Sequence, residues 1–175
     1  MQNSTSTLIA VLVAAALLFV VPLVTMTDRN DNVTQENVKL IVEEFVTDVK
    51  NTGKLTMAKY QNFENRLSAT GNVYDIEMEV QVLDENPGKK TTQANYTKIG
   101  ENVYYSEYTT QILDKLNGSS SLYPLKQGDI ISVSVKNQNS TTAQTLKSSF
   151  FSFSNEGQYA ISASSSGMVN VNGNN

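Results

Sequence analysis

Residues 8–24 read LIAVLVAAALLFVVPLV, an apolar run that only Pro22 interrupts. No Asp, Glu, Lys or Arg precedes Asp28, so uncharged flanks extend the segment to residues 5–27. As a helix this stretch is about 34 Å long, at about 1.5 Å per residue. The hydrocarbon core of a bilayer is about 30 Å thick. We therefore expect a membrane-spanning helix, which Pro22 should kink or loosen by one turn.

A cleaved secretory signal is the alternative for the same segment. Such signals carry a basic region before a shorter apolar stretch, whereas residues 2–7 read QNSTST and contain no Lys or Arg. The small residues 14–16 resemble a cleavage site, but further apolar sequence follows them. The pattern favours a helix that stays in the protein. Charges flank the run too sparsely to set its orientation, and the polar, Lys-sparse chain beyond it favours a head outside the cytoplasm.

A second helical pattern follows the polar stretch DRNDN at residues 28–32. Apolar residues recur there at helical spacing, with carboxylates on the opposite face. Asn32 with Gln35 resembles a helix start, and Gly53 resembles a stop. A helix over 33–51 is therefore expected, and it joins the apolar helix in one rod of about 47 residues if the polar stretch is only a bend. The residues expected to pack against the rest of the protein are Val38, Ile41, Val42, Phe45 and Val49.

The remaining residues, 53–175, have the pattern of a small α+β head. Short helical stripes alternate with amphipathic strands that lack long apolar runs, which indicates an antiparallel sheet with helices on one side. The clearest strand is 74–82, where apolar and acidic residues alternate. The chain thus divides into an apolar helix (1–27), an amphipathic helix (28–52) and the head. Expected helices in the head cover 56–68, 108–116 and 143–150, and expected strands cover 74–82, 96–99, 129–135 and 159–171.

The composition excludes several kinds of chemistry. The 175 residues include no Cys and no His, which rules out thiol nucleophiles, disulfides, zinc fingers and Ser-His relays. A net charge of −4 without a basic arm argues against a nucleic-acid partner. A Ser-Lys type of nucleophile has only the weak candidates Thr56 with Lys59 and Lys147 with Ser148. We therefore expect neither an enzyme nor a cofactor.

Two acidic groups are candidate cation sites. Asp28, Asn30 and Asn32 match the first three ligand positions of a calcium loop, but Val33 stands at its glycine position and Lys39 at its closing glutamate position. A capping or linker role is therefore expected. The second group, expected to be a solvated sheet face, is Asp75, Glu77 and Glu79.

The order of these segments resembles the type IV pilin family. Thr7-Leu8-Ile9 together with Pro22 is similar to the hydrophobic helix of such pilins. Residues 67–77, 125–129 and 166–168 resemble segments of pilin-like proteins from Tad-type secretion and pilus clusters of Gram-positive bacteria. Typical pilins have a basic leader, a cleavage glycine and a glutamate at the fifth mature position, whereas residues 1–27 contain no Gly and no charged residue. We therefore expect no processing by a pilin peptidase unless these residues are already the mature form, and no counterpart of the glutamate that registers pilin subunits.

This resemblance implies a structural subunit of a pilus or pilus-like secretion assembly. Its partners would be the membrane, other copies of itself, and a secretion ATPase with its platform protein. It would lie in the membrane with an extracytoplasmic head, or in a cell-surface filament. The alternative is a solitary membrane-tethered extracellular binding domain, an adhesin or envelope receptor. The residues expected to form the assembly helix are Leu8, Val11, Leu12, Ala14, Ala15, Ala16, Leu18, Phe19 and Pro22.

Overall fold

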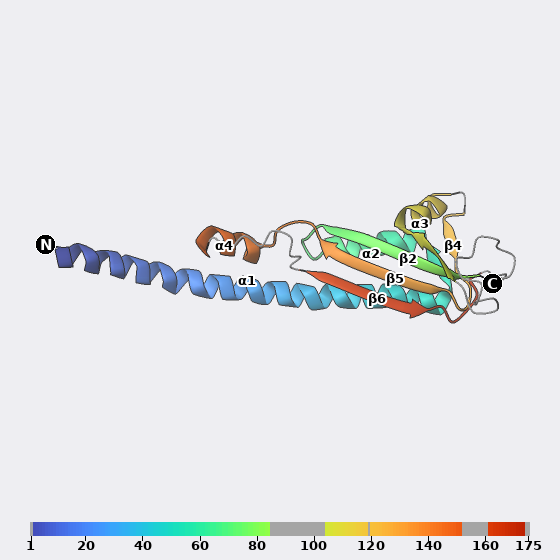
Figure 1. The fold of residues 1–175 in the computed structure, drawn as a ribbon, viewed down its shortest axis with the longest axis horizontal. Coiled ribbons are helices and arrows are strands. Elements are labelled where there is room, and N and C mark those ends of the chain that lie inside the picture. The colour runs from blue at the N-terminus through green and yellow to red at the C-terminus, as the bar shows by residue number, and fades with distance from the viewer. Residues whose placement is uncertain (1, 85–103, 119, 152–160, 174–175) are drawn as a thin grey trace, which may run out of the picture.

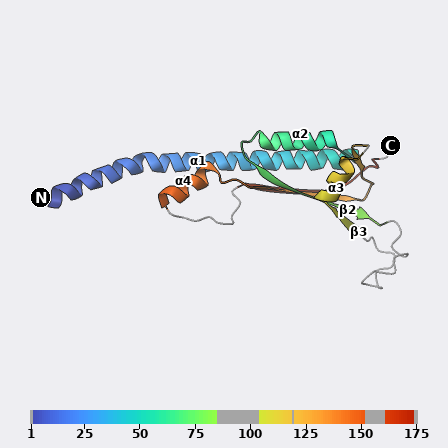
Figure 2. The same cartoon turned by 90° about the horizontal axis from the view of Figure 1, so that it is seen from above.

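The computed structural model describes residues 2–84, 104–118, 120–151 and 161–173 (Figure 1). A long N-terminal helix is followed by a small head with antiparallel sheets and short helices, which confirms the predicted α+β class. The helix, α1 (Gln2–Thr52), contains 51 residues. Its second half lies along the head, and its first half extends beyond the head (Figure 1, Figure 2).

The polar stretch at residues 28–32 does not interrupt α1, so the single rod is the arrangement observed. No Gly or Pro lies within it, and two of its carboxylates are bound by the head, as described below. Pro22 also lies inside the helix, and the Thr25 hydroxyl donates to the Val21 carbonyl at 2.9 Å just beyond it. Figure 2 shows a gentle curve over this first half rather than a break.

Gln35 does not start a helix, contrary to one of the expectations. Its side-chain oxygen accepts a hydrogen bond from the Ser162 backbone N–H at 2.8 Å, and its amide nitrogen donates to the Ser162 carbonyl. The side chain therefore binds the backbone at the beginning of an edge strand of the sheet. The long-range partner explains why a local capping pattern was misleading.

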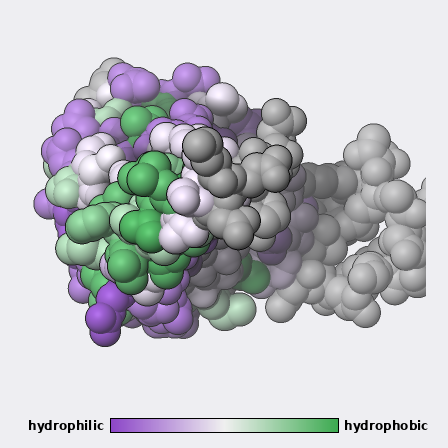
Figure 3. Space-filling model, turned by 90° about the vertical axis from the view of Figure 1, so that its left-hand side faces the viewer, coloured by the Kyte–Doolittle hydropathy of each residue, from purple (hydrophilic) through white to green (hydrophobic). Residues whose placement is uncertain are grey.

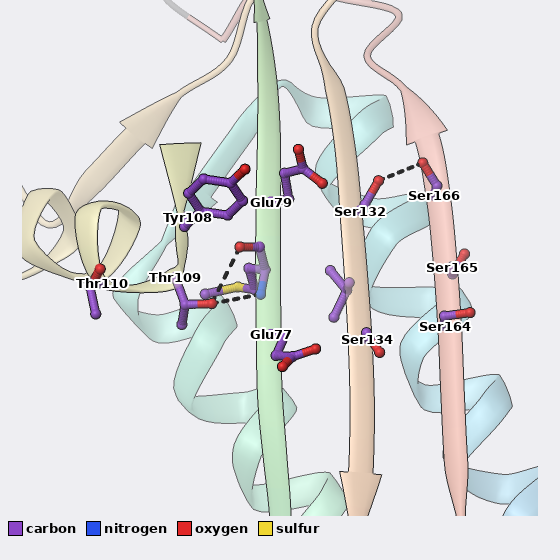
Figure 4. Close-up of a pocket in the computed structure, with 12 residues that line it drawn as sticks. Glu77, Glu79, Tyr108, Thr109, Thr110, Ser132, Ser134, Ser164, Ser165 and Ser166 are labelled. Carbon is purple, nitrogen blue, oxygen red and sulfur yellow. Dashed lines mark hydrogen bonds between the residues drawn. The ribbon is translucent and has the colours of Figure 1, made fainter. Parts of the chain in front are cut away.

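The head is built on a four-stranded antiparallel sheet in the order β3-β2-β5-β6. A second, two-stranded antiparallel sheet joins β1 to β4. The two helices α1 and α2 lie on the same face of the main sheet (Figure 2, Figure 4). The strands are β1 (Lys54–Thr56), β2 (Tyr74–Leu83), β3 (Tyr104–Tyr108), β4 (Leu122–Pro124), β5 (Ile130–Asn137) and β6 (Ser162–Met168), and the short helices are α2 (Met57–Ser68), α3 (Thr109–Leu116) and α4 (Thr142–Phe151).

The hydrophobic core lies between the main sheet and the helices α1 and α2. On the sheet side, Met78 pairs with Val133 and Val80 pairs with Ile131, and all four side chains are buried. Burial of these alternating residues explains why β2 and β5 carry their polar residues on the other face. The buried residues that the helices contribute are Val38, Ile41, Val42, Phe45, Val46 and Val49 of α1 with Tyr60, Phe63 and Leu67 of α2.

Gly53 ends α1 where the chain turns into β1. Its φ is +63°, and a Cβ at this position would lie 2.6 Å from the Val171 carbonyl oxygen. Its carbonyl accepts the Leu125 N–H at 2.8 Å. The end of the helix therefore contacts Leu125, just after β4, and the C-terminal segment at once, in a conformation that suits glycine.

The head differs from the sequence-based expectation in a few elements. Three-residue strands such as β1 and β4 are too short to show a period, and neither was predicted. Tyr108 ends a strand, and α3 begins one residue later than expected. Thr56 caps α2 as expected, accepting the Lys59 N–H at 3.2 Å. The strand predicted at 96–99 and the first residues of the last predicted strand lie outside the described residues.

Candidate membrane and assembly surface

The first half of α1 is the most exposed apolar surface of the described chain. Every predicted assembly residue lies there and is exposed, from Leu8 to Pro22. Figure 3 views the molecule from this end and shows hydrophobic side chains gathered at the surface. Among the described residues, α1 alone is long and apolar enough to cross a membrane, and its most apolar window has a mean hydropathy of 2.9 with no buried residue. By length and composition it fits a membrane anchor or a signal sequence.

The second half of α1 belongs to the head. The five residues predicted to pack there, Val38, Ile41, Val42, Phe45 and Val49, are all buried. Phe45 stacks on Phe63 of α2 with ring centroids 4.2 Å apart and planes inclined by 14°. Ion pairs flank this contact, from Lys59 to Asp48 at 2.7 Å and from Arg66 to Glu44. The first half of α1 is thus exposed, and one face of its second half is buried against the head.

An exposed apolar stripe connects the two halves of α1. Phe19, Met26, Val33 and Leu40 recur every seven residues and are 79%, 73%, 57% and 54% exposed. Seven residues are nearly two helical turns, so these side chains share one face of the helix. Val33 and Leu40 belong to the half that the head covers, and they point away from the buried residues. We call these four residues the α1 stripe.

The head holds α1 at the boundary between the halves through α4. The Thr141 hydroxyl donates to Asp31 at 2.6 Å, and Lys147 forms an ion pair with Asp28 at 2.6 Å. Thr141 also begins α4 in a reciprocal cap with Gln144, whose N–H it accepts at 3.3 Å and whose oxygen accepts the Thr141 N–H at 2.9 Å. Sequence reasoning missed this contact, since no local spacing links residues that lie more than a hundred positions apart.

The outer face of the main sheet carries the second candidate surface, a shallow depression of about 720 Å³ (Figure 4). Its polar walls are rows of serines and carboxylates. The Ser132 and Ser166 hydroxyls lie 2.8 Å apart, and Glu79 accepts the Ser106 hydroxyl at 2.6 Å. Glu77 forms an ion pair with Lys136 at 3.2 Å. The predicted acidic face is therefore a partly neutralised polar sheet surface.

A compact ionic cluster lies beside the sheet, around Glu107. Lys115 Nζ lies 2.6 and 2.7 Å from its two oxygens, and the Tyr123 hydroxyl donates to it at 2.7 Å. Burial by itself would raise the pKa of Glu107, but the hydrogen bonds and the Lys115 charge lower the pKa below its ordinary value. Burial and the Glu107 carboxylate raise the pKa of Tyr123. This cluster ties β3, α3 and β4 together.

The other candidates for chemistry have structural partners. Asp28 lies inside a helix rather than a loop, and Lys59 and Lys147, the two lysines of the candidate nucleophile pairs, both form ion pairs. Within the described residues, no group of three or more His, Cys, Asp or Glu side chains could hold a metal ion. Comparison with protein-family models, curated proteins and solved structures finds no match. The function therefore has to be inferred from the surfaces of α1, α4 and the sheet.

Proposed function

We propose that this protein is a structural, non-enzymatic subunit of a pilus or pilus-like secretion assembly. The apolar run of α1 holds it in a membrane with the head outside the cytoplasm, and α1 packs against other copies of the chain. A secretion ATPase and its platform protein would drive the assembly. The observation that carries the proposal is the α1 stripe, which continues past the apolar run onto the half of α1 that the head covers.

A bilayer would bury only part of the α1 stripe. Val33 and Leu40 follow Val24, the last residue of the apolar run, by about 14 and 24 Å along the helix. If residues 8–24 span the bilayer, these two side chains lie beyond the hydrocarbon core and remain exposed to water. Packing against α1 of a second copy would bury them together with the residues nearer the N-terminus, and burial of apolar surface stabilises such contacts.

The composition of the apolar run suits close helix contacts. Ala14, Ala15 and Ala16 are small, and Ala15 lies on the side of the helix that carries Leu12 and Phe19, at spacings of three and four residues. Small residues let neighbouring backbones approach within lipid, where no hydrophobic force drives helices together. Seven-residue spacing of exposed apolar side chains is also the repeat by which helices wrap around one another.

A solitary membrane-tethered extracellular binding domain is the second candidate, and the depression on the outer sheet face favours it. In an adhesin or envelope receptor, the serine and carboxylate rows of β2, β5 and β6 would contact a ligand. The tether would need α1 only as an anchor. It gives no role to Val33 and Leu40, and for this reason we place it second.

Cross-linking at single cysteines separates the two candidates, because the chain contains no Cys of its own. Leu40→Cys places a thiol on the α1 stripe, and the matched control Lys39→Cys places one at nearly the same height but about 100° around the helix. In native membranes, a short bifunctional thiol reagent should link copies of the Leu40→Cys variant and leave the control monomeric. A monomer for both variants would contradict assembly along α1 and favour the tethered domain.

A further inference from the structure

We propose that α4 is a membrane-surface helix, which rests on the bilayer beside α1 and places Phe150 among the lipid headgroups. This inference depends on the membrane insertion of the proposed function, and it does not depend on self-assembly. If it is right, α4 sets the depth at which the head sits on the membrane. Support comes from the position of α4, from the burial pattern of α1 and from the chemistry of the exposed end of α4.

The two contacts with α1 fix both the height and the direction of α4. Thr141 lies at Asp31 and Lys147 lies at Asp28, so α4 runs toward the N-terminus of α1 as its residue numbers rise. Figure 1 and Figure 2 show it beside α1, beyond the end of the sheet. Phe150 follows Lys147 by three residues, about 4.5 Å. It therefore lies on the N-terminal side of the level of Asp28, toward the end of the apolar run at Val24.

The burial pattern of α1 supports this height. Between residues 4 and 26, only Val20 and Val24 are half-buried, and every other residue is exposed. Both lie on the face of α1 that carries Asp28, since the three residues are spaced by four. On the side of α1 that faces α4, contact with the rest of the protein therefore continues into the end of the apolar run.

The exposed end of α4 suits a lipid surface better than water. Its sequence, TAQTLKSSFF, contains no acidic residue that anionic headgroups would repel, and Asp28 neutralises its one lysine. Phe150 is 54% exposed at the end nearest the apolar run. Large aromatic side chains gain most from burial, and Phe is among the residues that membrane-surface helices bury at the boundary between headgroups and acyl chains. If residues 8–24 span the bilayer, lipid headgroups must lie at this level, so lipid is the occupant we propose.

Single-tryptophan fluorescence tests the proposal directly, because the chain contains no Trp. The full chain is reconstituted into phosphatidylcholine–phosphatidylglycerol vesicles that carry a quencher near the headgroup or deep in the acyl region. Phe150→Trp should emit at shorter wavelength than in water and lose most of its intensity to the shallow quencher. Phe19→Trp reports on the apolar run and should respond most to the deep quencher. Tyr105→Trp, on β3 at the opposite end of the sheet, should respond to neither.

Each other outcome is decisive. Quenching of Phe19→Trp without quenching of Phe150→Trp would overturn the membrane-surface helix and leave the membrane anchor intact. If Phe150→Trp is blue-shifted but unquenched, and the shift grows with protein density, a second copy covers α4, which also overturns the proposal. No quenching of either variant would contradict membrane insertion itself. Adding Lys147→Ala to Phe150→Trp should weaken the shallow quenching, because it removes one of the two contacts that hold α4 at this height.

Discussion

Truncating Phe45 should destabilise the head by about 3–5 kcal/mol, the usual loss when Phe is replaced by Ala in a packed core. Phe45 is 6% exposed, and its ring stacks on Phe63. Of the total, about 0.5–1.5 kcal/mol belongs to this aromatic pair beyond its buried area. Domains have a total stability of only about 5–15 kcal/mol. Phe45→Ala should therefore lower the melting temperature by roughly 10 °C.

Leu40→Ala is the matched control, since Leu40 lies on the same helix and on the opposite face. Its exposed side chain contributes little to the head alone, so the free energy of unfolding should change by less than about 0.5 kcal/mol. The pair of variants separates burial of one helix face from the general effect of placing Ala in a helix.

Denaturant unfolding, followed by far-ultraviolet circular dichroism, measures both values on a chain that begins at Asp28. A double-mutant cycle of Phe45→Ala with Phe63→Ala isolates the energy of the aromatic pair. If Phe45→Ala lowers the free energy of unfolding by less than about 1 kcal/mol, or if Leu40→Ala lowers it as much as Phe45→Ala does, α1 does not pack with the assigned face and the described core is wrong.

Four further predictions concern the anchor, the head and its ionic cluster. A chain that begins at Asp28 should be soluble and show mixed helix and sheet by circular dichroism, because the core residues all follow that point; insolubility or a disordered spectrum would show that the head needs neighbouring subunits. N-terminal sequencing of native protein should find residues 8–24 retained, and a mature chain starting near residue 25 would make the protein a secreted soluble domain. Val13→Asp should raise the free energy of membrane insertion by roughly 2.5–3.5 kcal/mol, measurable as a lower membrane-bound fraction, unlike Val13→Ala. Because folding lowers the pKa of Glu107, its carboxylate stabilises the fold at pH values above the pKa of the unfolded carboxyl. This stabilisation is lost as the pH falls through the lower pKa of the folded state, so Glu107→Gln should flatten the acid limb of a curve of stability against pH.

The sequence predicted the elements that have a strong period. Each of three patterns comes from one face that is buried or apolar, so each can be recognised locally: the apolar run, the 3.6-residue period over 38–49 and the alternation over 74–82. The assigned fold class followed from their order. Gln35 shows the limit of such reading, since its partner is the backbone of Ser162, far away in the chain.

The candidate surfaces were only partly predictable. The apolar residues proposed for assembly could be named from hydropathy. The continuation of the α1 stripe to Leu40 needs the exposed fraction of each side chain, because Leu40 lies within an amphipathic pattern whose other apolar residues are mostly buried. The height of α4 likewise depends on Thr141 and Lys147 meeting carboxylates of α1. A hydroxyl and a lysine have many available partners, and only the folded chain selects among them.

The native size of the full-length protein in its membrane tests self-association through α1 most directly. The measurement compares wild type with Ala15→Phe, which places a large side chain where close helix contact is proposed, and with the control Ala15→Ser, which keeps the residue small. We predict assemblies of several copies for wild type and Ala15→Ser, and loss of those assemblies in Ala15→Phe with the head still folded. A monomeric wild type, or an Ala15→Phe variant that assembles as well as wild type, would contradict assembly through α1 and reduce the helix to an anchor.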